Sequence, residues 1–489
     1  MRILYFDVDT TRADHLSCYG YRRQTTPNMD RIAAQGVRFD NCYVSDAPCL
    51  PSRASMFTGQ FGIRTGIVGH GGTAADPRCM GAARGFSTMN QRPGFIWSLR
   101  QQGYYPVSVS PFAERHAAWW FYEGWREMYN TGKSGNESAE EVVPVALDWL
   151  ARHGKQDNWL LHINVWDPHT PYRAPAEFGN PFEHEPLDPW YTEALRQKQW
   201  QSWGAGSPRE PAGALGARYR AGPRQPLEVA SMDDYKRWVD GYDCGLRYTD
   251  MWFGRVLDAL ANLGVLEDTA IIVTSDHGET LGELAVIGDH QTADHITSRV
   301  PMIIRWPGQK DAGRVDRALH YQTDIAATII ELAGGKVPGH WDGRGFGAAF
   351  RTGTEEGREF LVVSQCAWSC QRSVRWAEWL SMRTFHTGLK KYPARMLYNV
   401  AEDPHLTRDL ATSRPDLVLQ GDRKLEEWTT AMLAGGAEDP LHTVMSEGGP
   451  YHTRGAHTEK YIQRLRDTGR GAAADFLQAH PTGLGEWIG

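Results

Sequence analysis

Cys49 opens the run Cys49-Leu50-Pro51-Ser52-Arg53, which continues as Ala54-Ser55-Met56-Phe57-Thr58-Gly59. The residues from Ser52 to Gly59 are typical of a helix, so we expect position 49 at a helix N-terminus. Unpaired backbone N–H groups and the helix dipole favour anions at such a place. Two interpretations are open from these residues. Either Cys49 takes part in chemistry on an anion, or it is a structural cysteine, since free cysteine is among the most buried residue types.

Two carboxylates and an imidazole follow short apolar runs that read as buried strands. Asp9 follows one such run, and the pair Asp276-His277 follows another. Ligands of open α/β sheets gather at strand ends of this kind. If the three side chains converge at one edge of the sheet, they would bind a divalent cation. Their oxygen ligands suit Ca²⁺ or Mg²⁺, and the imidazole allows Mn²⁺ or Zn²⁺. Asp7 shares the strand face of Asp9. We expect it to pair with a cationic side chain, with a role as a further metal ligand as the alternative.

A histidine, His169, follows a third buried run at 159–165, within Asp167-Pro168-His169-Thr170-Pro171-Tyr172. An imidazole titrates near neutral pH and can therefore transfer protons under physiological conditions. A histidine in a proline-rich turn is often merely solvated. The position directly behind a buried strand favours a catalytic role.

The pattern C-x-P-S-R followed by Thr-Gly resembles the signature of the type I sulfatases of the alkaline phosphatase superfamily. Four separated segments match that family in order and cover roughly residues 1–415. The resemblance implies that Cys49 is oxidised to formylglycine by a maturation enzyme. The hydrated aldehyde carries two hydroxyls on one carbon, so one can attack a sulfate ester while the other later expels sulfate.

The resemblance also implies roles for the other residues. One divalent ion is expected on Asp9, Cys49 (as formylglycine), Asp276 and His277, with Ca²⁺ favoured and Mn²⁺, Mg²⁺ or Zn²⁺ as alternatives. The expected catalytic residues are Cys49, Arg53, His169 and His290. Arg53 would hydrogen-bond the formylglycine and hold a metal-ligand carboxylate, and its planar fork suits such contacts. His169 would contact sulfate and protonate the departing oxygen.

Two departures affect the sulfate-binding half of the expected site. Many relatives carry a lysine eleven residues before the Pro of an R-V-P run, where this chain has His290. We expect His290 to donate to sulfate or to serve as a second acid. The G-K-W-H segment of the family is absent, and Pro111 and Ala113 fall where its lysine and histidine belong. Arg115 and His116 are the candidates to compensate, and the base that breaks down the sulfated intermediate stays unassigned.

The function that follows is hydrolysis of a sulfate ester of a small anionic substrate. A phosphonate monoester or phosphodiester hydrolase of the same superfamily is the first alternative, because some of these enzymes share the metal site and formylglycine. Monoanionic sulfate needs less positive compensation than a dianionic phosphate, so the missing lysines favour sulfate or a diester. A catalytically inactive binding protein of the same fold is the second alternative. The intact cluster of Cys49, Arg53, Asp9, Asp276 and His277 argues against it.

Strands that alternate with helices predict an α/β fold with a large, mostly parallel central sheet flanked by helices. The resemblance makes this an alkaline-phosphatase-like sandwich with a smaller C-terminal α+β subdomain. We expect a catalytic domain over 1–355, with 174–230 as an insertion or lid over the site, and a C-terminal subdomain and tail over 356–489. The insertion is rich in Pro, Gly and Trp, and loops of this length are usually functional.

Tryptophan is unusually frequent, with 19 residues. The default is core packing. Exposed rings that stack on a sugar are the alternative, and with the insertion they favour a sulfated carbohydrate as the substrate. The tryptophans in question lie in polar sequence at Trp119-Trp120, Trp190, Trp200 and Trp203.

Composition excludes several classes of partner. The net charge is −7, from 59 acidic and 52 basic residues without a basic tract, so we expect no nucleic-acid partner. No apolar run approaches the roughly 18 residues of a membrane span, and no membrane partner is expected. No signal-peptide pattern precedes the first strand, which predicts a cytoplasmic protein. The seven cysteines are too few and scattered for a disulfide framework. The oligomeric state stays open, with a homo-oligomer as one alternative.

Overall fold

The computed structural model describes residues 1–78, 80–81, 92–213 and 224–485. Cys79, residues 214–223 of the expected insertion and the last four residues of the expected tail lie outside the described part of the chain.

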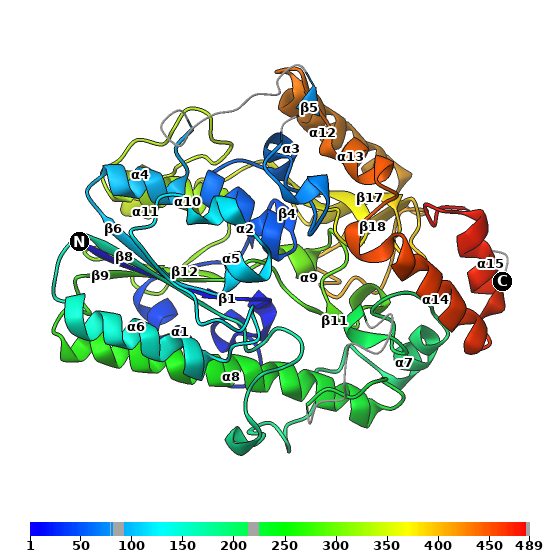
Figure 1. Ribbon diagram of the computed structural model, residues 1–489, viewed down its shortest axis with the longest axis horizontal. Helices are drawn as coiled ribbons and strands as arrows, with labels where there is room; N and C mark the ends of the chain where they lie inside the picture. The colour runs from blue at the N-terminus through cyan, green and yellow to red at the C-terminus, as the bar shows by residue number, and fades with distance from the viewer. Residues whose placement is uncertain (79, 82–91, 214–223, 486–489) are drawn as a thin grey trace.

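An eight-stranded sheet forms the centre of the larger part of the molecule (Figure 1). Every neighbouring pair of strands in it is parallel except the two pairs made by one strand, β12 (Met302–Arg305). The predicted mostly parallel sheet is therefore confirmed, with β12 as an antiparallel member. In spatial order the strands are β13 (Arg314–Asp316), β2 (Val37–Phe39), β12, β9 (Thr269–Thr274), β1 (Arg2–Val8), β8 (Trp159–Val165), β6 (Tyr105–Val109) and β7 (Glu127–Tyr129).

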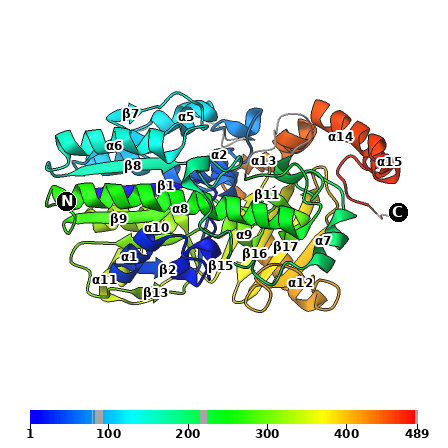
Figure 2. The same cartoon turned by 90° about the horizontal axis from the view of Figure 1, so that it is seen from below.

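Helices cover both faces of this sheet (Figures 1 and 2). One face carries α1 (Pro27–Gln35), α6 (Ala139–His153) and the long α8 (Met232–Asn262); the other carries α2 (Cys49–Thr58), α4 (Phe95–Gln101), α10 (Gln322–Leu332) and α11 (Gly347–Thr352).

Strand β1 shows how the sequence sets this arrangement. Ile3 and Tyr5 pack into the core on the α2 side, while Leu4, Phe6 and Val8 pack into the core on the α8 side. Side chains alternate along a strand, so an unbroken apolar run can only be buried between two layers of helix.

A second sheet of five strands lies beside the first and is built mainly from the C-terminal part of the chain. Its order is β18 (Arg395–Asn399), β17 (Trp379–His386), β16 (Cys370–Trp376), β15 (Phe360–Gln365) and β4 (Asp46–Ala47). The last strand comes from the segment directly before Cys49 and pairs in parallel with β15. The division of the chain near residue 355 stays a prediction, because β4 links both parts through one sheet.

The C-terminal helices pack around this second sheet and end beside the insertion (Figure 1). They are α12 (Pro415–Leu433), α13 (Pro440–Ser446), α14 (Ala456–Asp467) and α15 (Gly471–Ala479). Trp203 of the insertion packs with α14 and α15 in one apolar cluster.

The remaining elements are short. The helical ones are η1 (Ala13–His15), η2 (Ser17–Tyr19), α3 (Gly62–Thr65), η3 (Thr73–Ala75), α5 (Phe112–Arg115), η4 (Trp119–Tyr122), η5 (Ala176–Phe178), α7 (Glu193–Trp200), η6 (Pro211–Gly213), η7 (Glu283–Ala285), α9 (His295–Ser298) and η8 (Tyr451–Thr453). The strands are β3 (Cys42–Tyr43), β5 (Met80–Gly81), β10 (Thr280–Leu281), β11 (Ile287–Asp289), β14 (His320–Tyr321) and β19 (Ala437–Glu438). Within the described chain, no helix combines the length and the apolar character that crossing a bilayer requires. The six described cysteines are all free.

The tryptophans divide between the two interpretations. Trp119 is 60 % exposed, but Trp120 and Trp203 are buried at 8 % and 5 %. Trp190 stacks on His405 with ring centroids 4.1 Å apart. An exposed stacking platform is therefore wrong for Trp120 and Trp203, because neighbouring apolar segments that are distant in sequence cover them.

One buried histidine of the second sheet makes stability depend on pH. Burial lowers the pKa of His386 from 6.5 to about 4, and its Nδ1 accepts a hydrogen bond from the Gly388 N–H at 3.0 Å. The neutral ring is thus favoured in the folded state. Its contribution is fully present above about pH 6.5, the pKa in the unfolded chain, and is lost as the pH falls toward about 4.

The variant His386→Asn keeps an acceptor and cannot titrate. Between pH 7 and pH 4 the parent should lose about 3 kcal/mol of unfolding free energy more than this variant, from about 1.4 kcal/mol for each unit of pKa shift. Urea unfolding at stepped pH measures the difference, with His184→Asn at an exposed histidine as the control. Parallel pH curves for the parent and His386→Asn would contradict the assignment.

Candidate active site

Three neighbouring strands of the large sheet deliver the predicted side chains to one edge. Strand β1 pairs with β8 on one side and with β9 on the other. Asp9, His169 and Asp276 come shortly after the ends of β1, β8 and β9. Because all three strands run parallel, their carboxyl ends meet at the same edge of the sheet.

Cys49 is the first residue of α2, the position that the sequence predicted. Its Sγ lies 3.0 Å from Nε2 of His277. The ring nitrogen Nδ1 of His277 lies 2.8 Å from the carbonyl oxygen of Gly278. Since a carbonyl only accepts, Nδ1 carries the proton and Nε2 presents its lone pair toward Cys49.

Arg53, one helical turn after Cys49, binds three carboxylates at once. Its Nε donates to Asp7 Oδ2 at 2.9 Å, and one terminal nitrogen donates to Asp9 Oδ2 at 3.0 Å and to Asp276 Oδ2 at 2.5 Å. The guanidinium lies 4.9 Å from the ring centroid of Phe112. The predicted pairing of Asp7 with a cation is confirmed, and the cation is Arg53.

This cluster carries an excess of negative charge away from solvent. Three buried carboxylates surround a single buried guanidinium. Burial, followed by repulsion from Asp276, raises the pKa of Asp9 well above its usual value, while Arg53 holds the pKa of Asp276 low against the effect of burial. Oδ1 of Asp7 and Oδ1 of Asp9 have no hydrogen-bond partner. Buried carboxylate oxygens without a partner are costly unless a cation lies against them.

The cluster fits a divalent metal ion. One ligand atom from each of Asp9, Cys49, Asp276 and His277 lies within 4.8 Å of the others, and all four residues are buried. The donor set is mainly hard. It consists of two carboxylates, one imidazole and residue 49, whose ligand atom is an oxygen once the cysteine has been oxidised. The Nε2 of His277 is free of a proton, which a metal ligand requires. Burial, followed by Asp9 and Asp276, raises the pKa of the unmodified Cys49 thiol, so the thiol by itself stays neutral.

The opposite wall of the site carries His169, His290 and Arg115. Side-chain atoms of Cys49, His169 and His290 also lie within 4.8 Å of one another. His169 Nδ1 lies 2.6 Å from the carbonyl oxygen of Thr170, so Nε2 again faces the site, 3.5 Å from a terminal nitrogen of Arg115. The structure thus brings together every predicted site residue, and it places Arg115 beside them.

Burial affects both histidines on this wall. Burial, then Arg115 and Arg173, lower the pKa of His169, and burial with the nearby rings of His277 and His169 lowers the pKa of His290. In the free protein both rings are neutral at pH 7. An anion bound between them and Arg115 would favour their protonation.

Three further residues lie at the site, and no motif or spacing in the sequence was strong enough to predict them. Glu279 is fully buried, and its Oε2 lies 3.2 Å from His290 Nδ1. His70 accepts a hydrogen bond from the Leu50 N–H, and His452 of η8 contacts His70. Glu279 follows Asp276-His277 so closely that its burial could have been inferred. His452 is brought in only by the docking of the C-terminal part.

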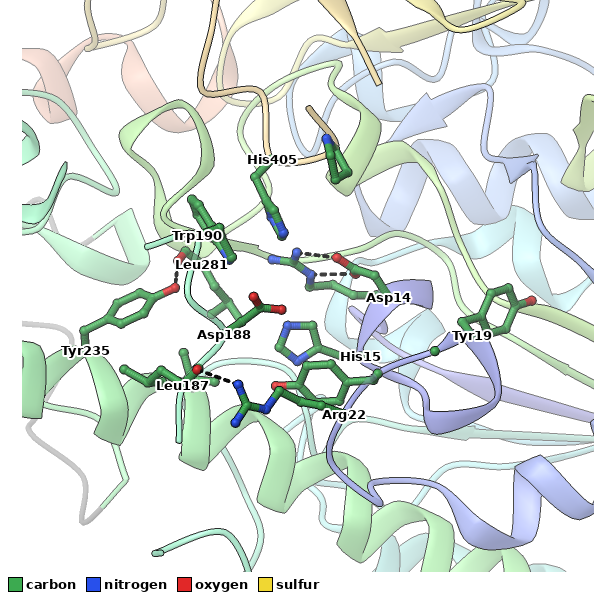
Figure 3. Close-up of a pocket in the computed structure, with 15 residues that line it drawn as sticks. Asp14, His15, Tyr19, Arg22, Leu187, Asp188, Trp190, Tyr235, Leu281 and His405 are labelled. Carbon is green, nitrogen blue, oxygen red and sulfur yellow. Dashed lines mark hydrogen bonds and ion pairs between the residues drawn. The ribbon is translucent and has the colours of Figure 1, made fainter. Parts of the chain in front are cut away.

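A separate cavity of about 240 Å³ contains none of the predicted site residues. In Figure 3, Asp188 of the insertion points toward His15, Arg22 donates to the Leu187 carbonyl, and Trp190 lies beside His405. Arg12 lines this cavity and is held by Asp14 at 2.7 Å and Glu283 at 2.8 Å. The cavity is thus distinct from the cluster around Cys49.

The sequence model of the sulfatase family matches residues 2–335, which hold all of the predicted site residues. The chain belongs to the sulfatase family. This sulfatase is a sulfuric ester hydrolase of the alkaline phosphatase superfamily, and a metal ion and formylglycine are typical of the family.

Curated relatives and solved structures agree with this assignment. The chain is 24 % identical over 394 residues to an N-acetylglucosamine-6-O-sulfatase of Bacteroides thetaiotaomicron, covering 69 % of this chain and 68 % of the relative. It is 28 % identical over 397 residues to the iduronate 2-sulfatase of Mus musculus, covering 69 % of each.

Two solved structures share the fold. The first is a protein solved in complex with its own substrate, D-glucosamine-2-N,6-O-disulfate. Its TM-score is 0.68 at 19 % sequence identity, and the match covers 90 % of this sulfatase and 99 % of that protein's chain. The other is the phosphonate monoester hydrolase of Agrobacterium radiobacter, with a TM-score of 0.67, 19 % identity and coverage of 88 % and 96 %. The predicted alkaline-phosphatase-like sandwich is thereby confirmed.

Replacement of Arg53 by lysine tests the carboxylate cluster. Lysine keeps the charge but lacks the planar fork that reaches Asp7, Asp9 and Asp276 together. Loss of a side chain that holds the metal ligands typically lowers metal affinity or activity 10- to 100-fold. Arg53→Lys should therefore reduce both the affinity for the metal ion and kcat by about that factor. Metal titration and steady-state kinetics measure both, with Arg408→Lys at an exposed position as the control. Unchanged metal affinity in Arg53→Lys would show that Arg53 does not organise the ligands.

Proposed function

We propose that this sulfatase hydrolyses a sulfate ester of a carbohydrate through a formylglycine hydrate at position 49. The observation that carries the proposal is the convergence of Cys49 with Asp9, Asp276 and His277 at the N-terminus of α2. A hydroxyl of the hydrate would attack sulfur while the ester S–O bond breaks. The second hydroxyl then loses its proton as the C–O bond to sulfate breaks, and the aldehyde is restored.

Maturation of Cys49 has to precede folding. Cys49 is 1 % exposed. An enzyme that oxidises this residue cannot reach it in the folded state. We therefore infer that a formylglycine-generating enzyme acts on the unfolded chain.

The metal would be held by Asp9, Asp276, His277 and an oxygen of residue 49. When bound, the ion would supply positive charge that polarises the sulfate ester and favours the ionised hydrate. Two carboxylates and an oxygen of the hydrate favour Ca²⁺, with Mn²⁺, Mg²⁺ or Zn²⁺ as alternatives that the imidazole allows. Arg53 holds Asp9 and Asp276 in place through its fork.

The remaining wall would bind sulfate and assist the leaving group. His169 presents Nε2 to the site and is the acid for the departing alcohol. His290 is held by Glu279 and donates to a sulfate oxygen from its other ring nitrogen. Arg115 supplies the positive charge that a lysine supplies in many relatives, since it lies beside His169.

Several observations support a carbohydrate. Two of the curated relatives are named for a sugar, N-acetylglucosamine and iduronate. Trp119 is 60 % exposed three residues after His116, and its Nε1 donates to Asp76 at 3.1 Å, which leaves the faces of the indole available. Aromatic faces of this kind stack on the apolar faces of sugar rings.

A phosphonate monoester or phosphodiester is the alternative substrate. The similarity to a phosphonate monoester hydrolase favours it, and so does the charge of the site, because these esters are monoanions like sulfate esters. A dianionic phosphate monoester fits less well, since among the described residues Arg115 is the one cationic side chain within hydrogen-bond distance of a ring nitrogen of His169 or His290.

Mass spectrometry of the tryptic peptide from Phe39 to Arg53 tests the nucleophile. Protein made with a maturation enzyme should show an aldehyde at position 49 and a free thiol at Cys42, which serves as an internal control in the same peptide. Cys49→Ala should lack both the aldehyde and esterase activity. A thiol at position 49 in a preparation that hydrolyses esters at full rate would refute the mechanism.

A substrate panel tests the ester class. We expect kcat/KM to rank glucosamine 6-sulfate and 4-nitrophenyl sulfate first, a phosphonate monoester lower, and 4-nitrophenyl phosphate lowest by about 10²-fold. The phosphate monoester carries one more negative charge than the site can balance. Leaving this charge without a partner costs about 3 kcal/mol in the transition state, which corresponds to about 10²-fold in rate. Arg115→Gln should depress all rates while keeping the order. A phosphonate monoester that is hydrolysed fastest would establish the alternative function.

A further inference from the structure

The second half of the reaction requires a base, and the described site offers none at the usual place. Pro111 and Ala113 stand where the sequence comparison with the sulfatase pattern expects lysine and histidine, and both are buried. Neither side chain can accept a proton. His169 and His290 lie on the wall assigned to sulfate and the leaving alcohol, so a different group must act on the remaining hydroxyl of residue 49.

His70 lies at the N-terminus of α2. Its Nε2 is 3.4 Å from the backbone nitrogen of Leu50. This nitrogen belongs to the peptide bond that follows residue 49, so Nε2 lies at most about 6 Å from the Cα of residue 49. At that range Nε2 can reach a hydroxyl on the side chain of residue 49 directly or through one water.

The hydrogen bonds of His70 fix its tautomer. A backbone N–H can only donate, so Nε2 of His70 accepts from Leu50 and carries no proton. The neutral ring therefore has its proton on Nδ1, which lies 2.9 Å from Nε2 of His452. His70 thus donates to His452 and keeps its basic nitrogen directed at the head of α2.

His452 is held in place by the C-terminal part of the chain. Its backbone N–H donates to Ala367 at 3.1 Å, and its ring stacks on Trp368 at 4.5 Å between centroids. The neighbouring Tyr451 packs so tightly on Gly71 that a Cβ at position 71 would come within 2.2 Å of the tyrosine ring. The loop that carries His70 and the segment that carries His452 are therefore fitted to each other.

We propose that His70 is the base that breaks down the sulfated intermediate, with His452 as the residue that positions it. The inference rests on the proposed function, because it requires a formylglycine hydrate at position 49. An imidazole that acts as a base usually donates from its second ring nitrogen to a hydrogen-bond acceptor. The acceptor fixes the tautomer and stabilises the imidazolium that forms.

The step balances within the site. The hydrogen bond from the Leu50 N–H to Nε2 of His70 opens, which frees the lone pair of this nitrogen. The remaining hydroxyl of residue 49 then gives its proton to Nε2, and its oxygen forms the carbonyl bond. The C–O bond to the sulfate group breaks, and the electron pair leaves on sulfate. The products are the aldehyde, a sulfate dianion and an imidazolium on His70 that donates from Nδ1 to His452. The imidazolium then releases its proton to solvent before the aldehyde is hydrated again.

The groups that face His70 keep it neutral before the step. Burial, and then the imidazoles of His116, His452, His290 and His277, lower the pKa of His70. His116 is the competing candidate, with its ring 5.0 Å from that of His70. Its Nε2 has no hydrogen-bond partner, and its ring packs on Phe112 and Trp166, so nothing fixes its tautomer toward α2.

The experiment separates the two halves of the reaction with 4-nitrophenyl sulfate. His70→Gln should release about one equivalent of 4-nitrophenol in a burst and then turn over about 10²- to 10⁴-fold more slowly than the parent. Acid-quenched peptide from Phe39 to Arg53 should carry an added SO₃ group on residue 49. His452→Leu should accumulate the same adduct, and His452→Gln, which keeps an acceptor for His70, should recover most of the rate. His116→Gln is the matched control and should show neither a burst nor an adduct.

The outcomes are distinct. The adduct forms only in folded, matured enzyme, so its presence in His70→Gln excludes misfolding; if His70→Gln does not fold, the adduct in His452→Leu carries the test. Three results would overturn the assignment of His70. They are parent-like turnover in His70→Gln, loss of the burst in His70→Gln although its aldehyde is intact, and an adduct that forms in His116→Gln instead. A parent enzyme that is active with a thiol at position 49 would overturn the proposed function itself.

Discussion

The whole site depends on one buried guanidinium among three carboxylates. Arg53 reaches Asp7 and Asp9 from β1 and Asp276 from the end of β9, and thereby ties α2 to two neighbouring strands. Removing one partner of such a buried cluster typically costs 3–5 kcal/mol, because the remaining charges stay uncompensated. Three carboxylates against one arginine leave negative charge that a divalent cation can balance. The same contacts that fix the fold at this edge therefore create the metal site.

The second physical constraint is the contact of the C-terminal part with the segments before and after Cys49. Strand β4 ends just before Cys49 and lies in the C-terminal sheet, and His452 contacts His70 from the same side. One half of the site is thus built on the large sheet, with carboxylates and a metal-binding imidazole. The other half consists of histidines and one arginine, held in a buried setting where neutral rings are favoured.

The fold was largely predictable from local patterns. The apolar runs at 159–165 and 270–274 became β8 and β9, since only buried parallel strands are apolar on both faces. The antiparallel direction of β12 was not predictable, because strand polarity depends on how the chain returns to the sheet. For Trp120 and Trp203 the sequence favoured burial as the default but left exposed rings open as an alternative, since their covering residues come from segments far away in the sequence.

The sequence by itself predicted a nucleophile, four metal-ligand positions, Arg53 and two sulfate-side histidines, because each lies in a short motif or directly after a strand. The structure brings these residues together. Only the tertiary structure decided that Arg115 lies beside His169 and that His452 contacts His70. These pairings join elements whose separation along the chain leaves no periodic or local trace, and packing alone sets them. The chemistry at Cys49 could thus be predicted from residue types and spacing, whereas the protonation of its surroundings required the folded arrangement.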